Sequence, residues 1–254
     1  MAGDIDVPSE VAELGAAINR SGNIVFFGGA GVSTESGIPD FRSAGGLYDG
    51  AEGVYPPERM LSHSFFISHT KEFFKFYREK MLYPDARPNR AHEKLAELER
   101  AGRLRAVITQ NIDGLHQKAG SKNVIELHGS VSRNYCTRCK KAHDARRIIE
   151  SDGVPVCECL GVVRPDIVLY EEELNQNDIA RALELIEQAD MLIIGGTSLA
   201  VYPANSLVRY YTGDKLIIIN KTETHFDSRA ALTVRRGIAE AMGMIDVEPL
   251  RAAT

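Results

Sequence analysis

The sequence predicts an α/β fold, in which a Rossmann-like parallel sheet carries helices on both faces and a small second domain is attached. Three observations predict it. Short apolar runs end in glycine or polar residues, helix-like segments alternate with these runs, and all four cysteines lie between Cys136 and Cys159. With 254 residues, of which 44% are hydrophobic, the chain is long enough for one main core and a smaller module.

Composition and charge exclude several classes of protein. The formal net charge of -5 gives no basic surface of the kind that binds nucleic acid. No apolar run reaches the roughly 18 residues that a membrane helix needs, and no apolar run near the start suggests an export signal. We therefore expect a cytoplasmic monomer without nucleic acid or membrane partners. In a reducing compartment, clustered cysteines favour a metal site over disulfides.

The first helix is expected to begin at Ser9, whose hydroxyl can cap the helix, and to end before Gly22. Its apolar stripe consists of Val11, Leu14 and Ile18. An apolar run at 24–27 then predicts the first strand of the sheet.

A glycine-rich loop, GGAGVSTESGIPDFRS, follows this strand at 28–43. Gly29, Ala30 and Gly31 lack bulk, so their N–H groups can face a pyrophosphate. The sixth position is Thr34, which makes the motif GxGxxT and leaves a simple tight turn as the alternative. The continuation SGIPDFR differs from the smooth entry into a helix that dehydrogenases show. It predicts a loop that does more than hold phosphate.

The next segments are an irregular loop at 44–57 and an aromatic helix at 64–82. Most of the aromatic side chains are expected in the core, with one or two lining a pocket. A helix at 91–101, closed by Gly102, precedes the second strand. In the expected aromatic helix at 64–82, the residues at roughly helical spacing are Phe66, Phe73, Phe74, Tyr77 and Met81.

Two further apolar runs, each a predicted strand, end in polar side chains. In a parallel sheet, ligands bind at the edge formed by the carboxyl ends of the strands. The first leads into TQNIDGLH and places Gln110, Asn111 and Asp113 at this edge. The second ends at His128. Turn formation is the alternative for the Asn and Asp, and a structural role is the alternative for the histidine.

Two cysteine pairs, Cys136-x-x-Cys139 and Cys157-x-Cys159, are separated by 17 residues. This is close to a zinc-ribbon spacing, and four thiolates leave no open position for catalysis, so a structural zinc is predicted. Four free buried thiols are the alternative.

The last third of the chain has a regular α/β pattern, preceded by an extended segment at 167–170 that can pair with another chain. Asn220 stands at the polar end of a late strand. The expected elements are a helix with Ile179, Leu183 and Ile186 on one face, strands at 191–194, 215–219 and 232–234, a glycine turn at 195–198, a helix opened by Pro203, and a final helix.

The chain contains the following motifs in this order: GAGVSTESGIPDFR, TQNIDGLH, ELHGSV, the cysteine pairs, RPDIV, GGTSL and an Asn-ended strand. With this set of motifs the chain resembles the sirtuins, which are NAD-dependent protein deacylases. The resemblance covers about residues 24–238. It implies one catalytic domain over 1–254, with a helical insertion at 44–88, a zinc-binding module at 132–163 and a Rossmann-like NAD-binding remainder. An acetylated protein lysine would lie in the cleft beside 167–170 as an added strand.

The resemblance also assigns site residues. His128 would be the general base, assisted by Asn111 and Asp113, and the products would be free lysine, nicotinamide and 2′-O-acetyl-ADP-ribose. The zinc ligands would be Cys136, Cys139, Cys157 and Cys159. Residues implied to bind NAD are Ala30, Gly31, Ser33, Thr34, Phe41, Arg42, Gln110, Ile112, Asp113, Thr197, Ser198, Asn220 and Ile238. Residues implied to bind the peptide are Val163, Ile167, Val168 and Tyr170.

The chain departs from the family pattern in two places. One residue separates Cys157 from Cys159 where two are usual, and Glu171 stands where many members have glycine. Phe74 and Tyr77 occupy the positions at which desuccinylating members carry Tyr and Arg, so acetyl and other apolar acyl groups are expected. Two competing functions are an NAD glycohydrolase or ADP-ribosyltransferase, and a non-catalytic module that senses NAD or ADP-ribose.

Overall fold

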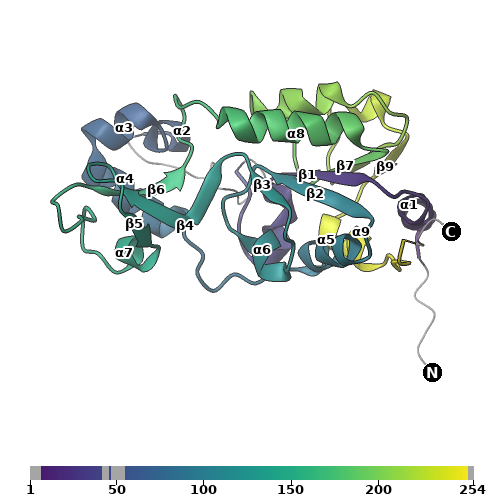
Figure 1. Cartoon of the computed structure of the whole chain (residues 1–254), viewed down its shortest axis with the longest axis horizontal. Coiled ribbons are helices and arrows are strands. Elements are labelled where there is room, and N and C mark those ends of the chain that lie inside the picture. The colour runs from purple at the N-terminus through teal and green to yellow at the C-terminus, as the bar shows by residue number, and fades with distance from the viewer. Residues whose placement is uncertain (1–6, 42–45, 47–54, 251–254) are drawn as a thin grey trace.

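The computed structural model describes residues 7–41, 46 and 55–250. Among these residues, six parallel strands form the main sheet, in the order β3-β2-β1-β7-β8-β9. The sheet lies in the right half of Figure 1. The order reverses between β1 and β7, and ligands of such sheets bind at this point. The strands are β1 Ile24–Gly28, β2 Leu104–Thr109, β3 Val124–Glu126, β7 Met191–Gly195, β8 Leu216–Ile219 and β9 Leu232–Val234. The predicted fold class is confirmed.

Helices cover both faces of this sheet. Helix α8 and the 3-10 helix η3 lie on one face, and α1, α5 and α9 pack on the other, with α6 beside them (Figure 1). No helix among the described residues is long and apolar enough to cross a bilayer. The bounds are α1 Ser9–Asn19, α5 Arg90–Arg100, α6 Leu115–Ala119, α8 Gln176–Gln188, η3 Ala204–Tyr210 and α9 Ile238–Gly243.

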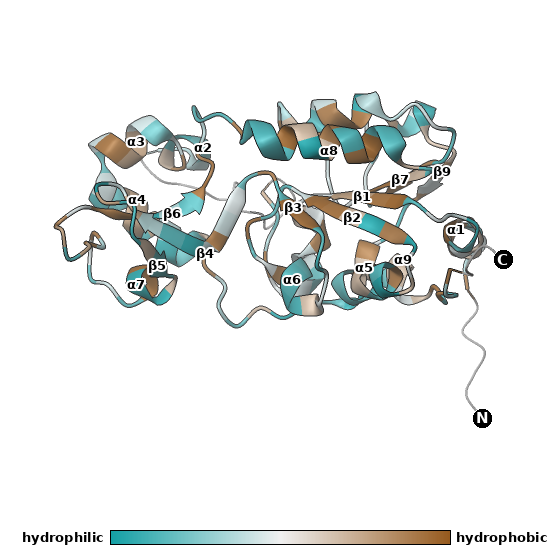
Figure 2. Ribbon diagram, in the orientation of Figure 1, coloured by the Kyte–Doolittle hydropathy of each residue, from teal (hydrophilic) through white to brown (hydrophobic). Residues whose placement is uncertain are grey.

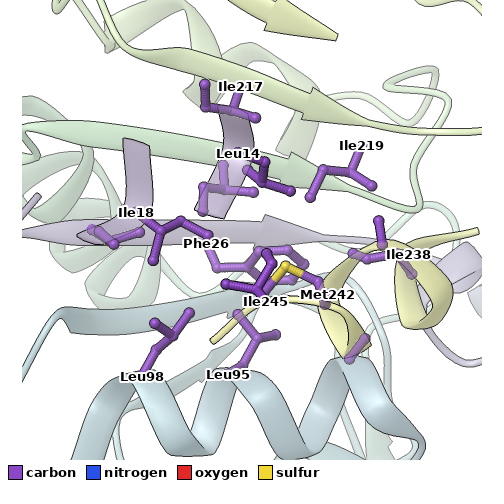
Figure 3. Packing of buried hydrophobic residues seen from close by; sticks show 14 of the residues in the cluster. Leu14, Ile18, Phe26, Leu95, Leu98, Ile217, Ile219, Ile238, Met242 and Ile245 are labelled. Atoms are coloured by element: carbon purple, nitrogen blue, oxygen red, sulfur yellow. The ribbon is translucent and has the colours of Figure 1, made fainter. Parts of the chain in front are cut away.

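Strands buried on both faces need apolar side chains at every position, and β1 and β7 are apolar throughout (Figure 2). Phe26 belongs to the apolar cluster on the face of α1, α5 and α9, which also contains Leu14, Leu95 and Met242 (Figure 3). Val25 belongs to the cluster on the other face. Each central strand therefore contributes to two separate cores.

The smaller part of the molecule combines two segments that are distant in sequence. Helices α2 Pro57–Met60, α3 His63–Ser68 and α4 Thr70–Lys80 pack on a three-stranded antiparallel sheet in the order β5-β4-β6. Phe73 and Phe74 of α4 share one apolar cluster with Cys136 and Cys157. The other bounds are β4 Gly129–Cys136, β5 Ala142–Asp144, α7 Arg146–Ile149 and β6 Val163–Ile167.

Several local expectations need correction. Pro8, and not Ser9, occupies the N-cap of α1, and the helix ends at Asn19 before Gly22. The expected aromatic helix at 64–82 is two helices, because the backbone leaves helical geometry at His69, where φ is -133°. The helix expected after Pro203 is the 3-10 helix η3. Most of the loop expected at 44–57 lies outside the described residues.

The remaining predicted elements are confirmed within one or two residues. Val11, Leu14 and Ile18 of α1 are buried as expected. Gly102 follows α5 with φ of +76°, the conformation that glycine adopts at little cost after a helix.

Candidate active site

The ends of β1 and β7 each continue into a glycine turn, and the two turns interlock. The N–H of Gly31 donates to the carbonyl of Gly196 at 2.8 Å, and that of Gly29 to the carbonyl of Gly195 at 3.3 Å. A Cβ atom on Gly31 would lie 2.8 Å from the Gly196 oxygen, so only glycine fits there. We expected the N–H groups of Gly29, Ala30 and Gly31 to be able to face a pyrophosphate. That expectation is wrong for Gly29 and Gly31, because their N–H groups donate to carbonyls of the second turn.

The segment after β1 folds into two short 3-10 helices, η1 Ala30–Val32 and η2 Thr34–Ser36. Thr34 donates its hydroxyl to the Gly31 carbonyl at 3.1 Å. This geometry differs from the long helix that follows a dehydrogenase fingerprint, as the GxGxxT motif and its continuation predicted. Residues 38–41 then return along the wall of a cavity.

A chain of hydrogen bonds joins this loop to the end of β2. Asn111 Nδ2 donates to Ser33 Oγ at 3.1 Å, and Ser33 Oγ donates to Asp113 Oδ2 at 2.7 Å. The other carboxylate oxygen of Asp113 accepts the Leu115 N–H at 2.8 Å. Ser33 is only 1% exposed, so the hydroxyl at the centre of this chain is shielded from water and holds the Asn111 and Asp113 side chains in fixed orientations.

His128 follows β3 and lies beside the same strand ends. Its Nδ1 is 2.9 Å from the carbonyl oxygen of Gln110. A carbonyl can only accept, so Nδ1 carries the proton and Nε2 keeps its lone pair. Burial lowers the pKa of His128, while the bond to Gln110 opposes this effect. The imidazole is therefore neutral near pH 7, as a proton acceptor must be.

A cavity of about 510 Å³ opens along these residues and extends to the end of β6 in the smaller part of the molecule. Its size is in the range of small-molecule sites. It brings together most residues that the sequence singled out: Ala30, Gly31, Ser33, Phe41, Gln110, Asn111, Ile112, Asp113, His128, Ile167, Val168, Tyr170, Thr197, Ser198 and Asn220.

Three predicted site residues are placed elsewhere, and a fourth lies outside the described residues. Thr34 stabilises its own turn, Ile238 is buried in the core with α1 and α5, and Val163 is buried beside Cys136. None of these three lines the cavity. The fourth, Arg42, lies outside the described residues.

The expected pairing strand at 167–170 is largely occupied. Val168 donates its N–H to the His128 carbonyl, and Tyr170 donates its N–H to the carbonyl of Leu61, both at 3.0 Å. The Tyr170 carbonyl accepts the N–H of His63, also at 3.0 Å. A peptide added beside this segment would therefore have to use groups other than those of Tyr170.

The four cysteines come together away from the cavity. The Sγ atoms of Cys136, Cys139, Cys157 and Cys159 all lie within 4.8 Å of one another. Cys136 and Cys159 are 3.4 Å apart, and Cys139 and Cys157 are 3.7 Å apart. Four thiolates about 2.3 Å from a tetrahedral zinc would be about 3.8 Å from each other, so these residues fit a zinc ion. No open position remains, and the site is structural.

The comparison with protein families decides the classification. The model of the Sir2 family matches residues 29–203. The chain belongs to the Sir2 family. This confirms the resemblance to the sirtuins that the motif order suggested.

Individual sirtuins are similar over almost the whole chain. An NAD-dependent protein deacetylase of Clostridium tetani is 57% identical over 244 residues, which is 95% of this chain and 98% of the relative. A protein of the same description from Cutibacterium acnes is 53% identical and covers 92% of this chain and 96% of its own. A solved structure of Sir2 with a p53 peptide and NAD+ has a TM-score of 0.79 at 43% identity, over 91% and 94% of the two chains.

The short link between the last two cysteines closes in a tight turn. The Leu160 N–H donates to the Cys157 carbonyl at 2.9 Å, and Leu160 has φ of +65°. Gly161 allows the close approach, since a Cβ there would lie 2.6 Å from Cys136 Sγ. This sirtuin therefore keeps the thiolate cluster with one residue fewer than usual.

Sequence reasoning missed one part of the cavity wall in this sirtuin. Phe74 and Tyr77, the positions expected to meet the acyl group, are 0% exposed and do not line the cavity. The wall instead includes 80–84, which starts at the last residue of α4, together with Lys118 and Ile149. The only sequence signal for this segment was the end of the aromatic helix before Pro84.

Proposed function

We propose that this sirtuin is an NAD-dependent protein lysine deacetylase, which transfers an acetyl group from lysine to ADP-ribose and releases nicotinamide and 2′-O-acetyl-ADP-ribose. The observation that supports it most is that one cavity joins His128, the chain from Asn111 to Asp113, and the end of β6. Relatives 53–57% identical are described as enzymes of this kind. Solved Sir2 structures contain acetylated peptide or NAD+.

The residues around the interlocked glycine turns would hold NAD, which supplies the ribose carbon that receives the acetyl oxygen once nicotinamide has left. Asn111 and Asp113 orient the ribose and nicotinamide groups, because the buried Ser33 hydroxyl fixes both side chains. Phe41 lines the cavity and excludes water from the reacting face.

His128 acts as the general base through Nε2. The Gln110 carbonyl fixes the proton on Nδ1, so the lone pair on Nε2 is available to take a proton from a ribose hydroxyl. The lowered pKa of His128 keeps this lone pair free at neutral pH.

The competing functions differ in one measurement, which is nicotinamide release by the purified protein with and without an acetylated peptide. Deacetylation requires the peptide, whereas a glycohydrolase or ADP-ribosyltransferase releases nicotinamide without it. A module that only senses NAD or ADP-ribose releases none. We expect release to depend on the peptide.

We also propose that acetyl is preferred to succinyl. Arginine is absent from the described residues that line the cavity, whose cations are Lys80 and Lys118. A desolvated acyl carboxylate would have no bidentate partner there. A solved Sir2 structure with a propionylated peptide supports slightly longer apolar groups. Faster turnover of succinyl-lysine than of acetyl-lysine in the same peptide would contradict this preference.

The domain bounds and the cellular context belong to the same proposal. The helical insertion spans 44–88 and the zinc-binding module spans 132–163, since α2 to α4 and the cysteine cluster share one apolar core separate from the main sheet. The thiolate cluster suits a reducing compartment, which supports a cytoplasmic enzyme. A monomer follows if light scattering gives a mass near 28.0 kDa.

A further inference from the structure

Glu171 has an unusual backbone conformation for its residue type. Its φ is +74°, in the left-handed region that glycine adopts freely and other residues avoid. The position follows Tyr170 at the end of the segment from β6, and both residues line the cavity. A glutamate there is strained relative to glycine, so a compensating interaction is required.

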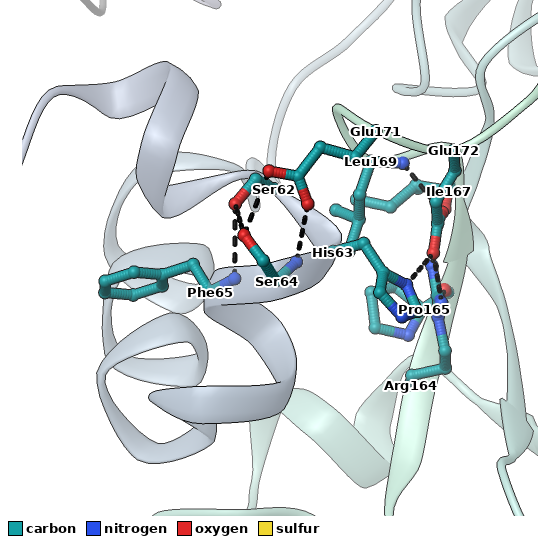
Figure 4. Close-up of polar contacts among 10 residues, drawn as sticks. All are labelled: Ser62, His63, Ser64, Phe65, Arg164, Pro165, Ile167, Leu169, Glu171 and Glu172. Atoms are coloured by element: carbon teal, nitrogen blue, oxygen red, sulfur yellow. Dashed lines mark hydrogen bonds and ion pairs between the residues drawn. The ribbon is translucent and has the colours of Figure 1, made fainter.

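The side chain of Glu171 provides this interaction. Its Oε2 accepts the main-chain N–H of Ser64 at 2.8 Å, and its Oε1 accepts the Ser64 hydroxyl at 2.9 Å (Figure 4). Ser62 caps the same helix, since its hydroxyl accepts the Phe65 N–H at 3.2 Å. Two side chains thus satisfy first-turn N–H groups of α3 that have no partner within the helix. The carboxylate of Glu171 reaches this turn from a segment 107 residues away.

The main chain joins the same two segments. Tyr170 exchanges hydrogen bonds with Leu61 and His63, forming a parallel bridge opposite Ser62. Glu172 accepts from Arg164 at 2.8 and 3.0 Å, and its Oε1 is 2.7 Å from His63 Nδ1. Figure 4 shows Glu171 bonded to Ser64 and, separately, Glu172 bonded to Arg164 and His63.

The joined segments form one wall of the cavity. Leu61, Tyr170 and Glu171 line it, and Val168, two residues before Tyr170, is bonded to the main chain of His128. The position of residues 168–171 therefore sets the distance between this wall and the general base. A wall held in place before the substrate arrives reduces the ordering cost of binding.

We infer that Glu171 is a positioning residue for the acetylated peptide, which fixes the wall at 168–171 by bonding to the start of α3; this inference rests on the proposed deacetylase function. Glu171 acts through Ser64 and does not touch the reacting atoms. Both carboxylate oxygens are already engaged, so we assign the residue to holding the wall and not to selecting basic residues in the peptide.

The test compares Glu171→Gly, Glu171→Ala and Glu171→Gln with the wild type in the full chain. For each protein, kcat, the KM of an acetylated peptide, the KM of NAD and the melting temperature are measured. Glycine removes both the strain and the carboxylate, alanine removes only the carboxylate, and glutamine keeps an oxygen for the Ser64 N–H. Glu173→Gln is the matched control, because this neighbouring acid does not line the cavity.

Glycine and alanine should raise the KM of the peptide roughly three- to tenfold, by the usual size of a lost charge-assisted hydrogen bond. The kcat and the KM of NAD should stay within about twofold of the wild type, since the NAD residues lie on other segments. Glutamine should restore most of the peptide affinity. Ser64→Ala, which keeps the charge of Glu171, should raise the KM of the peptide in the same direction.

Two outcomes overturn the inference while deacetylation stands. One is an unchanged KM of the peptide in Glu171→Gly and Glu171→Ala, even with a lower melting temperature, which would make the residue merely structural. The other is a loss confined to peptides with basic flanking residues and absent in Ser64→Ala, which would show charge selection. A wild type that neither binds nor turns over acetylated peptide would instead overturn the proposed function, and the inference with it.

Discussion

His128 and Asp113 lie in one cavity, but their hydrogen bonds differ, and so do the roles that we propose for them. The bond of His128 to the Gln110 carbonyl leaves one ring nitrogen available as a base. Both oxygens of Asp113 accept hydrogen bonds, one from the Ser33 hydroxyl and one from the Leu115 N–H, which keeps the carboxylate oriented. The His128 side chain can therefore accept a proton, whereas the Asp113 carboxylate can only position the substrate and stabilise charge on it.

His128→Ala should therefore reduce deacetylation roughly 10²- to 10⁴-fold, the usual contribution of a general base. Exchange of labelled nicotinamide into NAD should be largely spared, because nicotinamide departs before the base is needed. Asp113→Ala should impair exchange as well. Parallel melting curves provide the control: a folded His128→Ala protein with near-normal deacetylation would exclude His128 as the base.

Tyr77 illustrates a different cost at the residue scale. It is 0% exposed and stacks on Phe73, yet its hydroxyl has no hydrogen-bond partner among the described residues. Burial also raises the pKa of Tyr77. A buried hydroxyl without a partner is destabilising, while the ring itself stabilises the core.

Tyr77→Phe should leave the free energy of unfolding unchanged or raise it by about 1 kcal/mol, since it removes only the unpaired hydroxyl. Tyr77→Ala is the matched comparison and should cost about 3–5 kcal/mol, because it leaves a large cavity. Urea denaturation of the three proteins measures both effects. A loss of more than about 1 kcal/mol in Tyr77→Phe would show that the hydroxyl is bonded after all.

At the scale of elements, the thiolate cluster connects the small sheet to the helices packed on it. Cys136 ends β4, and both Cys136 and Cys157 are buried in the cluster that contains Phe73 and Phe74. The small sheet has only three strands, of which β5 spans three residues. So small a sheet depends on its metal for much of its stability.

Cys139→Ser should consequently lose the zinc and unfold the small sheet, with far less effect on the main sheet. Elemental analysis should give one zinc per wild-type chain and clearly less in the variant, and limited proteolysis should cut the variant within 132–163. Glu158→Gln, between the ligands Cys157 and Cys159, serves as the control and should keep its metal. Substoichiometric zinc in wild-type protein purified without chelator would contradict a four-cysteine site.

Element type was easier to predict from the sequence than the way each element begins or breaks. The continuous apolar runs of β1 and β7 predicted buried strands, since no other element in this fold needs apolar side chains on both faces. The break at His69 was not predictable, because the aromatic spacing continues across it while Ser62 caps only the first helix. A polar residue at a helix start gave the wrong cap at Ser9, since the preceding Pro8 has φ and ψ suited to the N-cap.

At the scale of the whole molecule, the motifs predicted the site because the carboxyl ends of β1, β2 and β7 meet at one edge. Motifs that follow these strands in the sequence are therefore close together in the fold. No sequence pattern predicts contacts between individual side chains that are distant in sequence. The bond from Glu171 to Ser64 and the pairing of His92 with His116, whose ring centroids are 4.7 Å apart, follow only from the packing of separate elements.

The two histidines make the stability of the whole molecule sensitive to acid. Both are fully buried, and the Nε2 of His92 and both ring nitrogens of His116 have no hydrogen-bond partner among the described residues. Burial lowers the pKa of His92 to about 4, although Asp113 opposes the shift. Burial, reinforced by His92, lowers the pKa of His116 to about 3. Each ring therefore stays neutral in the folded state at pH values where it would be protonated in the unfolded chain.

Because a histidine in the unfolded chain titrates near pH 6.5, the unfolded state binds more protons than the folded state below that pH. As the pH is lowered from 6.5 to about 4 or 3, the free energy of unfolding should fall by up to about 1.4 kcal/mol per pH unit for each histidine. Between pH 6.5 and 5 the carboxylate of Glu172, whose pKa the Arg164 bond lowers to about 2, stays ionised in both states and contributes little. Urea denaturation across this window measures the slope.

His116→Phe, which keeps an aromatic ring beside Phe26 and His92, should reduce the slope by one histidine's share. A stability independent of pH over this window, or an unchanged slope in the variant, would show that the pair is protonated or hydrated in the folded protein.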